Sequence, residues 1–252
     1  MSLPALVPAW PVASHVRAFC TLRTGGVSAA PYASLNLATH VGDAPAAVGE
    51  NRRRLHSQLS LPAEPLWLEQ VHGIRVLDAD APGGARAPAD AAITRKSGRV
   101  LAVLVADCLP VLLATRAGDA IAVAHAGWRG LAAGVIERTV EALGAPPAQL
   151  LAWLGPAISA PHFEVGSEVR TTFVSQHAQA AAYFSANARG RWQCDLAGLA
   201  RQRLGALGVG SIHDSQWCTA SDPARFYSFR REGQTGRIAA LLWIADAEEN
   251  RD

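Results

Sequence analysis

The amino-acid sequence predicts a layered α/β protein (mixed α+β) whose strands form mixed sheets. Half of the 252 residues are apolar and 17% are charged, which is typical of a globular chain with a large core. Strand-like apolar runs and segments with helical spacing follow one another without a strict strand–helix–strand alternation. No segment has the composition of a linker, so we expect one domain that spans residues 1–252.

The first strand and the first helix are predicted by local patterns. Residues 15–23 alternate like a half-buried strand and lead into a loop rich in turn-forming residues. Residues 40–61 predict a helix that Asp43 caps and in which Pro45 occupies the first turn. Three apolar side chains share one face of this helix: Val48, Leu55 and Leu59.

Four strands are predicted in the middle of the chain. LWLEQVHG and IRVLDAD, residues 66–73 and 74–80, precede a loop at 81–90. Residues 100–108, VLAVLVADC, are apolar on both faces and therefore predict a central strand. Residues 121–128, IAVAHAGW, form the next predicted strand.

The chain then continues as a mixture of helices and strands. A helix is predicted at 131–143, ended by Gly144, because four side chains form a stripe: Leu131, Val135, Thr139 and Leu143. Residues 150–155 predict a short strand, and residues 165–178 predict a helix.

The last predicted elements are one helix and two strands. Residues 195–208 predict a helix that begins at the cap Asp195 and ends at Gly208. Residues 226–232 and 237–245 predict two closing strands that the turn GQTG connects.

Charge and apolar runs argue against several classes of protein. The 23 basic and 21 acidic residues leave a net charge of +2, which gives no electrostatic reason to expect a nucleic-acid partner. The longest apolar run, VLAVLVADCLPVLLA, is interrupted by Asp107 and Pro110 and is shorter than the roughly 20 residues that span a bilayer. The first residues lack the positive charge of a secretory signal. We expect a cytoplasmic monomer that binds neither nucleic acid nor membrane.

The four cysteines, Cys20, Cys108, Cys194 and Cys218, lie far apart and form no CxxC pair. This spacing predicts neither a disulfide framework nor a local zinc knuckle. Cys20 belongs to the alternating pattern of the first strand, so we expect a small core residue there. Cys108 differs, because it follows the central strand directly after an acidic residue.

Three side chains that bind metals come at or just after the ends of predicted strands: His72, Cys108 and His125. They converge if the three strands are neighbours. Two imidazoles and one thiolate suit zinc or copper better than magnesium or calcium. Three protein ligands leave a fourth position open, as in catalytic zinc sites. Alternatively, the histidines are solvated loop residues and the cysteine belongs to the core, because ligands spread over some fifty residues have no local signature.

Asp107 is an acidic residue at the end of an otherwise apolar strand. A buried carboxylate needs a partner, which an arginine or the N–H of a ligand imidazole could provide. Alternatively, Asp107 lies at the strand exit and caps a turn.

The heptapeptide AHAGWRG, residues 124–130, combines groups that packing alone does not require. Gly127 and Gly130 permit tight backbone geometry and close approach of a substrate. Trp128 offers an apolar plate, and Arg129 stands near a predicted helix N-terminus, where anions are favoured. In the alternative interpretation Trp128 belongs to the core and Arg129 is solvated.

Together these segments resemble one known family. The motifs are TGGVSAAPYASLNL, HVGD, NRRRL, EQVHG, ADCLPVLL, AHAGWRG, LGPAI, FEVG, CT and FYSFRREGQTGR, in this order between about residues 17 and 245. Together they are similar to the laccase-domain family, whose members are described as bacterial polyphenol oxidases, multifunctional purine nucleoside phosphorylases and peptidoglycan-editing factors. The resemblance implies a four-layer α/β/β/α sandwich with a metal site built from His72, Cys108 and His125.

The resemblance also implies an activity. The expected chemistry is phosphorolysis of adenosine, inosine and methylthioadenosine to free base and pentose-1-phosphate, with deamination of adenosine. Zinc is the expected metal and copper the alternative. This sequence departs from the family where a cysteine commonly precedes the aromatic-Glu-Val motif, since His162 stands there.

Phosphorolysis requires groups that hold a phosphate dianion. Candidates are Arg129, Arg23 beside TGG, and Arg230 or Arg231 in SFRRE, because a guanidinium matches phosphate geometry. Asn36 could bond a sugar hydroxyl or a base edge, although asparagine in such a loop also caps turns.

Other activities use the same residues. In a cysteine hydrolase that edits peptidoglycan precursors, Cys108 is the nucleophile, His125 or His72 the base, and Asp107 or Asn36 the orienting group. Copper-dependent oxidation of phenols normally needs several coppers, and the eight histidines form no HxH pair. A binding module with a structural metal would need a fourth ligand.

Overall fold

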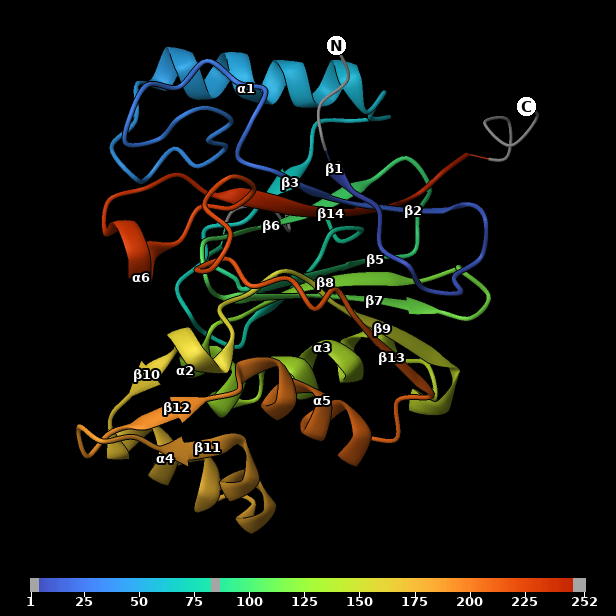
Figure 1. The fold of residues 1–252 in the computed structure, drawn as a ribbon. Coiled ribbons are helices and arrows are strands. Elements are labelled where there is room, and N and C mark those ends of the chain that lie inside the picture. Colours follow the sequence, from blue (N-terminus) through green and yellow to red (C-terminus); the bar gives the residue numbers. More distant parts are fainter. Residues whose placement is uncertain (1–4, 83–86, 247–252) are drawn as a thin grey trace.

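The computed structural model describes residues 5–82 and 87–246, and its centre is a pair of β-sheets that pack face to face (Figure 1). One helix covers the outer face of the first sheet, and several helices cover the outer face of the second. The expected four-layer α/β/β/α sandwich is therefore confirmed. The α-helices of the described part are α1 (Pro45–Gln58), α2 (Trp128–Ala133), α3 (Val135–Leu143), α4 (Ser167–Val174), α5 (Leu196–Ala206) and α6 (Phe229–Glu232).

The strands fall into three sheets. The five-stranded sheet, next to α1, has the order β1 (Ala5–Leu6), β2 (Val16–Thr21), β14 (Ile238–Ile244), β6 (Val100–Val105) and β3 (Leu66–Trp67). The six-stranded sheet has the order β13 (Ser211–Asp214), β9 (Leu150–Leu154), β7 (Leu109–Thr115), β8 (Ile121–Ala126), β5 (Ala91–Thr94) and β4 (Val76–Asp78). A small outer sheet has the order β10 (Glu164–Val165), β12 (Trp192–Cys194) and β11 (Phe184–Ala186). Both large sheets are mixed, because β3–β6, β4–β5 and β13–β9 are parallel pairs and the others are antiparallel.

The central strands are apolar on both faces because each sheet is covered on both sides. Successive side chains of a strand point to opposite faces. In β6, alternate residues therefore reach two different cores. Those that face the other sheet are Leu101, Val103 and Val105, and those on the α1 side are Val100, Ala102 and Leu104. The prediction of a central strand at this position is confirmed.

The start of α1 differs from the prediction. Ala44 occupies the N-cap position without a side-chain hydrogen bond, and Pro45 is in the first turn as expected. Asp43 instead accepts hydrogen bonds from Ser28 Oγ and Asn36 Nδ2, at 2.6 and 2.9 Å. Its carboxylate therefore ties the preceding loop together.

One predicted helix proves to be two. Gly134 adopts a left-handed conformation with φ of 103°, which ends α2 and begins α3 within the single helix expected at 131–143. Gly144 ends α3 in a left-handed conformation, as predicted. In α5, Asp195 is the predicted N-cap and accepts a hydrogen bond from the Gly198 backbone at 2.8 Å.

The strand predicted at 226–232 is wrong. Phe226, Tyr227 and Ser228 are buried in succession rather than alternately, and the chain then forms the short helix α6. Ser228 caps this helix, because its hydroxyl accepts a hydrogen bond from the Arg231 backbone N–H at 3.2 Å. The strand predicted at 237–245 is confirmed as β14.

Seven strands of the described residues were not expected: β1, β5, β7, β10, β11, β12 and β13. The apolar run that begins at Val100 is broken at Ala106–Cys108, where Asp107 has a φ of 85°, and the chain crosses from β6 in one sheet to β7 in the other. None of the helices in the described part of the chain combines the length and the apolar character that crossing a membrane requires.

Candidate active site and metal centre

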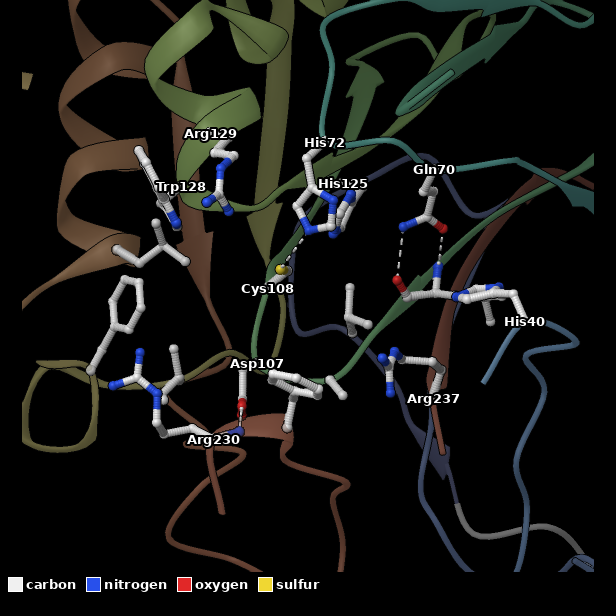
Figure 2. Close-up of a pocket in the computed structure, with 17 residues that line it drawn as sticks. His40, Gln70, His72, Asp107, Cys108, His125, Trp128, Arg129, Arg230 and Arg237 are labelled. Carbon is white, nitrogen blue, oxygen red and sulfur yellow. Dashed lines mark hydrogen bonds between the residues drawn. The ribbon is translucent and has the colours of Figure 1, made fainter. Parts of the chain in front are cut away.

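His72, Cys108 and His125 come together at one end of the sandwich (Figure 2). His72 lies on the connection from β3 to β4, and Cys108 lies on the corner from β6 to β7. Both connections cross from one large sheet to the other, whereas His125 is a residue of β8 itself. One ligand atom from each side chain lies within 4.8 Å of the others. The predicted convergence is confirmed.

The three donors fit a transition-metal ion. Cys108 Sγ lies 3.8 Å from His72 Nε2, and the two imidazole rings have centroids 4.8 Å apart and planes at 74°. In a tetrahedral zinc site, a cysteine sulfur and a histidine nitrogen at their usual bond lengths from the metal lie about 3.5 Å from each other. The cluster could therefore hold zinc or copper. His125 is buried, Cys108 is half-buried and His72 is exposed, so one side of the cluster is open.

Asp90 connects two members of this cluster and was missed in the sequence. Its side chain accepts a hydrogen bond from His125 Nδ1 at 2.8 Å and from the backbone N–H groups of His72 and Gly73 at 2.9 and 2.7 Å. Burial opposes ionisation of Asp90, but the hydrogen bonds from His125 and Gly73 outweigh it and hold the pKa of this carboxyl below its usual range. With Nδ1 donating to Asp90, His125 turns Nε2 to the cluster.

A signal for Asp90 was present in the sequence. It is an acidic residue placed directly before the short run AAIT, whereas Asp107 comes at the end of an apolar strand. Because AAIT was not identified as strand β5, Asp90 was assigned to the preceding loop.

The cluster shifts the proton affinities of its own members in the metal-free protein. Burial would raise the pKa of Cys108, but the charges and hydrogen bonds of His125 and His72 lower it to about 6. Burial would lower the pKa of His125, but Cys108 and Asp90 raise it to about 9. A thiolate beside an imidazolium is therefore the favoured state of this pair.

The glycines of AHAGWRG have the steric role expected of them. A Cβ atom at Gly127 would lie 2.9 Å from His72 Cδ2 and 3.0 Å from Cys108 Sγ. A Cβ atom at Gly130 would lie 2.9 Å from the Gly73 carbonyl oxygen. Both positions are therefore restricted to glycine by close packing against the cluster.

The partners of Asp107 differ from both that were expected. Its carboxylate accepts hydrogen bonds from Thr219 Oγ1 at 2.6 Å, Ser228 Oγ at 3.0 Å and the Arg230 backbone N–H at 2.7 Å. Neither a guanidinium nor an imidazole contacts it among the described residues, and Asp90 takes the imidazole instead. Asp107 thus fixes the segment that carries α6 against the cluster.

The cluster opens into a cavity of about 420 Å³. Figure 2 shows Trp128 and Arg129 on one side of Cys108, and His40, Gln70 and Arg237 on the other. The apolar residues that line the cavity are Leu104, Val105, Ala106, Ile158, Phe163, Leu196 and Phe229. The wall with Trp128 and Arg129 and the wall with His40, Gln70 and Arg237 thus lie on either side of the His72–Cys108–His125 cluster.

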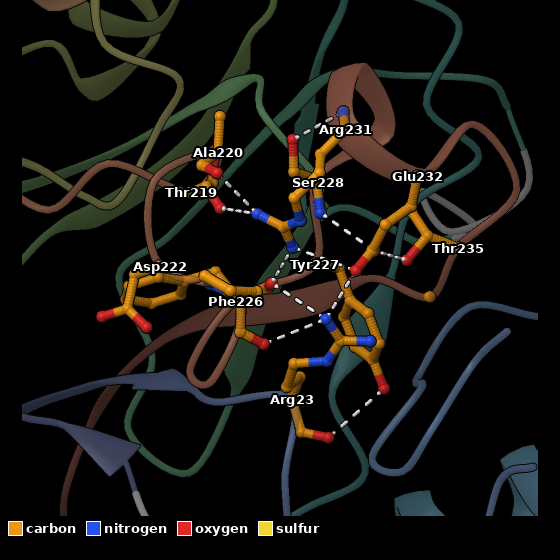
Figure 3. Close-up of polar contacts among 12 residues, drawn as sticks. Arg23, Thr219, Ala220, Asp222, Phe226, Tyr227, Ser228, Arg231, Glu232 and Thr235 are labelled. Atoms are coloured by element: carbon orange, nitrogen blue, oxygen red, sulfur yellow. Dashed lines mark hydrogen bonds and ion pairs between the residues drawn. The ribbon is translucent and has the colours of Figure 1, made fainter. Parts of the chain in front are cut away.

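Of the arginines predicted to hold phosphate, Arg129 and Arg230 line the cavity. Arg23 and Arg231 do not, because both are engaged by Glu232, at 2.7 and 3.0 Å, and by backbone carbonyls (Figure 3). Most donors of these two guanidinium groups are used to hold the segment before α6, and neither residue lines the cavity.

Asn36 is also committed to structure. It is fully buried, donates to Ala38 O at 3.0 Å and accepts from the Arg237 backbone N–H at 3.0 Å. This contradicts a direct role in binding sugar or base. His162, which stands where the family has a cysteine, is exposed and does not line the cavity.

Arg237 and His40 also line the cavity and were not predicted from the sequence; Arg237 directly precedes β14, and His40 lies in the loop before α1. Arg237 directly precedes an apolar strand and His40 precedes a predicted helix, and neither position is unusual for a surface residue.

The chain has close relatives among known proteins. A family model described as multi-copper polyphenol oxidoreductase laccase matches residues 17–245. A purine nucleoside phosphorylase of Pseudomonas aeruginosa is 52% identical over 242 residues, which cover 96% of this chain and 98% of that protein. The purine nucleoside phosphorylase YfiH of Escherichia coli is 48% identical over 239 residues, which cover 95% and 98%.

Solved structures of similar proteins have the same fold. A protein from Neisseria meningitidis superposes with a TM-score of 0.92 at 44% identity, covering 96% of this chain and 99% of that chain. YlmD from Geobacillus stearothermophilus superposes with a TM-score of 0.86 at 31% identity, covering 94% of both chains.

Proposed function

Since this chain belongs to the multi-copper polyphenol oxidoreductase laccase family, and its relatives at 48% and 52% identity are named purine nucleoside phosphorylases, we propose that it is a metal-dependent purine nucleoside phosphorylase. One observation supports this most directly: the cluster of His72, Cys108 and His125 faces a cavity large enough for a small molecule. The substrates we propose are adenosine, inosine and methylthioadenosine, with orthophosphate as the second substrate.

The reaction exchanges one bond for another. The bond from the sugar C1′ to the purine nitrogen breaks with its electron pair going to the base, and a phosphate oxygen bonds to C1′. The base nitrogen takes up a proton, so the products are free purine and pentose-1-phosphate. The cavity is lined by aromatic side chains, among them Trp128, Phe163 and Phe229, which suit a planar purine because aromatic and aliphatic groups bury its faces.

His72, Cys108 and His125 would hold the metal, which we propose is zinc, with copper as the alternative. A zinc ion with three protein ligands supplies Lewis-acid chemistry at its open position. Asp90 orients His125, and Gly127 leaves room for His72 and Cys108 to approach each other. Within the described residues one group of this kind is present, whereas phenol oxidation by dioxygen normally requires several coppers.

We also propose that the same site deaminates adenosine. Water adds at C6 of the purine, ammonia leaves, and inosine is the product. The two proposed activities share the aromatic lining of the cavity and the cluster but differ in the group that attacks.

Zinc-loaded protein incubated with adenosine tests both proposals in one experiment. Products are identified by mass with and without orthophosphate. Adenine and ribose-1-phosphate that form only with phosphate indicate phosphorolysis, and inosine without phosphate indicates deamination. If no purine nucleoside is converted, the proposed function is wrong.

A cysteine hydrolase that edits peptidoglycan precursors is the second candidate. It is favoured by the lowered pKa of Cys108, about 6, beside two histidines. In that reaction Cys108 attacks a carbonyl carbon and does not bind metal. Activity that survives complete removal of metal by a chelator, and that iodoacetamide abolishes, would favour this candidate over the phosphorylase.

A further inference from the structure

The cavity carries more positive charge than its own acids balance. Arg129, Arg230 and Arg237 line it, and none of them forms an ion pair with a carboxylate of the described residues. The carboxylate that lines the cavity, Asp107, already accepts hydrogen bonds from two hydroxyl groups and one backbone N–H. Unneutralised guanidinium groups in a partly enclosed space favour an anionic ligand.

Arg237 is the guanidinium best prepared for that ligand. It directly precedes β14, is half-buried, and its Nη1 donates to the carbonyls of Thr235 and Gly236 at 2.9 and 3.0 Å. Its backbone N–H is tied to Asn36 Oδ1. Within the described residues Nε and Nη2 form no hydrogen bond, although together they are the edge that grips a phosphate or carboxylate with two parallel hydrogen bonds. Because the side chain is already held, binding costs little additional ordering.

The surroundings of Arg237 also suit an anion. Figure 2 shows its side chain reaching from β14 toward the cavity, with His40 and Gln70 on the same wall. Both polar atoms of the Gln70 amide form hydrogen bonds with the Leu104 backbone, at 2.9 and 2.7 Å, so they are not available to a ligand. Arg237 is the cationic group on this wall. Burial and the charges of Arg237 and Arg52 lower the pKa of His40, which leaves a neutral ring able to donate one hydrogen bond.

Arg129 and Arg230 belong to the other wall. Arg129 is exposed and lies over the Trp128 ring, with Cζ 4.5 Å from the ring centroid. Arg230 is exposed, donates to the Glu164 carbonyl at 2.9 Å and lies over the Phe163 ring. Both are therefore associated with the aromatic groups that suit a purine.

We propose that Arg237 forms an anion subsite that binds orthophosphate through Nε and Nη2, across the His72–Cys108–His125 cluster from Trp128. The identity of the anion rests on the proposed phosphorylase function, whereas the site itself rests on the geometry. Orthophosphate and the nucleoside would then enter opposite ends of one cavity and meet beside the cluster.

The test measures orthophosphate binding directly, by calorimetry on zinc-loaded protein without nucleoside. We expect Arg237→Met to weaken binding about tenfold or more, because a bidentate charge-assisted contact is lost. Arg237→Lys keeps the charge but loses the planar fork, so we expect a smaller loss. Arg138→Met removes an exposed arginine of α3 that pairs with Glu141, and we expect it to bind phosphate like the wild type.

Kinetics and a second ligand complete the test. In phosphorolysis, Arg237→Met should raise KM for phosphate about tenfold and change KM for inosine less than about threefold. Adenosine 5′-monophosphate distinguishes free phosphate from a phosphate ester, and we expect Arg237→Met to affect orthophosphate more strongly.

Several outcomes would overturn the subsite. The subsite is wrong if the wild-type protein binds no orthophosphate, or if Arg237→Met binds it normally. It is also wrong if Arg237→Met weakens binding of adenosine 5′-monophosphate alone, or if Arg129→Met or Arg230→Met weakens orthophosphate binding instead. If Arg237→Met does not fold, as judged by circular dichroism, the Arg237→Lys comparison decides. A protein that binds phosphate through Arg237 but cleaves no nucleoside would leave the subsite standing and refute the proposed function.

Discussion

The carboxylate of Asp90 accepts a hydrogen bond from Nδ1 of His125 at 2.8 Å, and it does so from the first position before strand β5. The antiparallel register of β5 and β8, in which Ala91 faces Ala124, places the two residues side by side. The backbone agrees with the side chains, because the His125 N–H donates to the Asp90 carbonyl at 2.7 Å. One carboxylate thus holds both the imidazole of the candidate ligand His125 and the loop that carries His72.

This relationship predicts the effect of Asp90→Asn. An amide keeps the shape but loses the charge that favours Nδ1–H on His125, so we expect zinc affinity to fall about 10–100-fold. Competition against a chromophoric chelator measures that affinity. Asp80→Asn is the matched control, because Asp80 also accepts a backbone N–H, from Arg95 at 2.8 Å, outside the cluster. Equal zinc affinity in wild type and Asp90→Asn would refute the prediction.

The Cys108 thiol should be reactive in metal-free protein. Its pKa is lowered to about 6, whereas burial raises the pKa of both Cys20 and Cys194 to about 12. Cys218 is half-buried and its pKa is also lowered, because burial is outweighed by hydrogen bonds with Ser159 and Ser221, so it should be modified as well. The thiolate is the nucleophile, so alkylation of Cys108 by iodoacetamide should rise with pH to half its maximum near pH 6. Mass spectrometry of peptides identifies the modified residues, and zinc should slow the modification of Cys108. A half-maximum near pH 9 would contradict the prediction.

Cys108→Ala should remove zinc binding and nucleoside turnover together. A site with two imidazoles left binds zinc much more weakly, and Cys108 is only partly buried where it packs against the apolar core. We expect a native circular dichroism spectrum, less than about 1% of the wild-type activity, and less than one tenth of the bound zinc by atomic absorption. Full activity in this variant would show that the cluster is not the active site.

A methyl group at position 127 should separate the ligands. Because a Cβ atom there would lie within 3.0 Å of both His72 and Cys108, Gly127→Ala should lower zinc affinity at least tenfold. Gly205→Ala is the control, since a Cβ atom in α5 at that position meets nothing within 4 Å. We expect this control to bind zinc normally and to be more stable by about 0.5–1 kcal/mol. Unchanged zinc affinity in Gly127→Ala would mean that the loop relaxes freely.

The ion pairs of Glu232 with Arg23 and Arg231 should make the free energy of unfolding depend on pH. Burial opposes ionisation of Glu232, but Thr235, Arg23 and Arg231 lower its pKa to about 2 from an ordinary value of 4.5. A carboxyl with a lowered native pKa binds fewer protons when folded, so its contribution is complete above pH 4.5 and is lost as the pH falls towards 2.

Glu232→Gln tests this contribution by urea unfolding at several pH values. We expect the variant to be less stable by about 1–2 kcal/mol at pH 7, and the difference to shrink steadily between pH 4.5 and pH 3. Glu141→Gln, in a pair whose side chains are 59% and 70% exposed, should show a difference near zero at all pH values. A Glu232→Gln difference that is independent of pH would contradict this account.

The local sequence pattern was enough to predict the elements whose side chains are uniformly buried or whose ends are set by a capping residue. The apolar runs of β6, β8, β9 and β14 and the caps at Asp195 and Gly144 depend on neighbouring residues alone. Prediction failed where a contact from elsewhere decided the outcome. Ser228 and Asp107 together turn a segment predicted as a strand into α6. The division of one predicted helix into two is a local effect of the left-handed Gly134.

The amino-acid sequence by itself determined the layered fold, the three candidate ligands and the family, because these follow from residue type, periodicity and motif order. Only the tertiary structure decided which side chains share the cavity. Arg23, Arg231 and Asn36 are withdrawn into structural contacts, while Asp90 and Arg237 are placed beside the cluster. The physical reason is that residues far away in the chain determine whether a polar side chain is already hydrogen-bonded or free to bind a ligand. Strand register and the crossings between the sheets determine which residues those are.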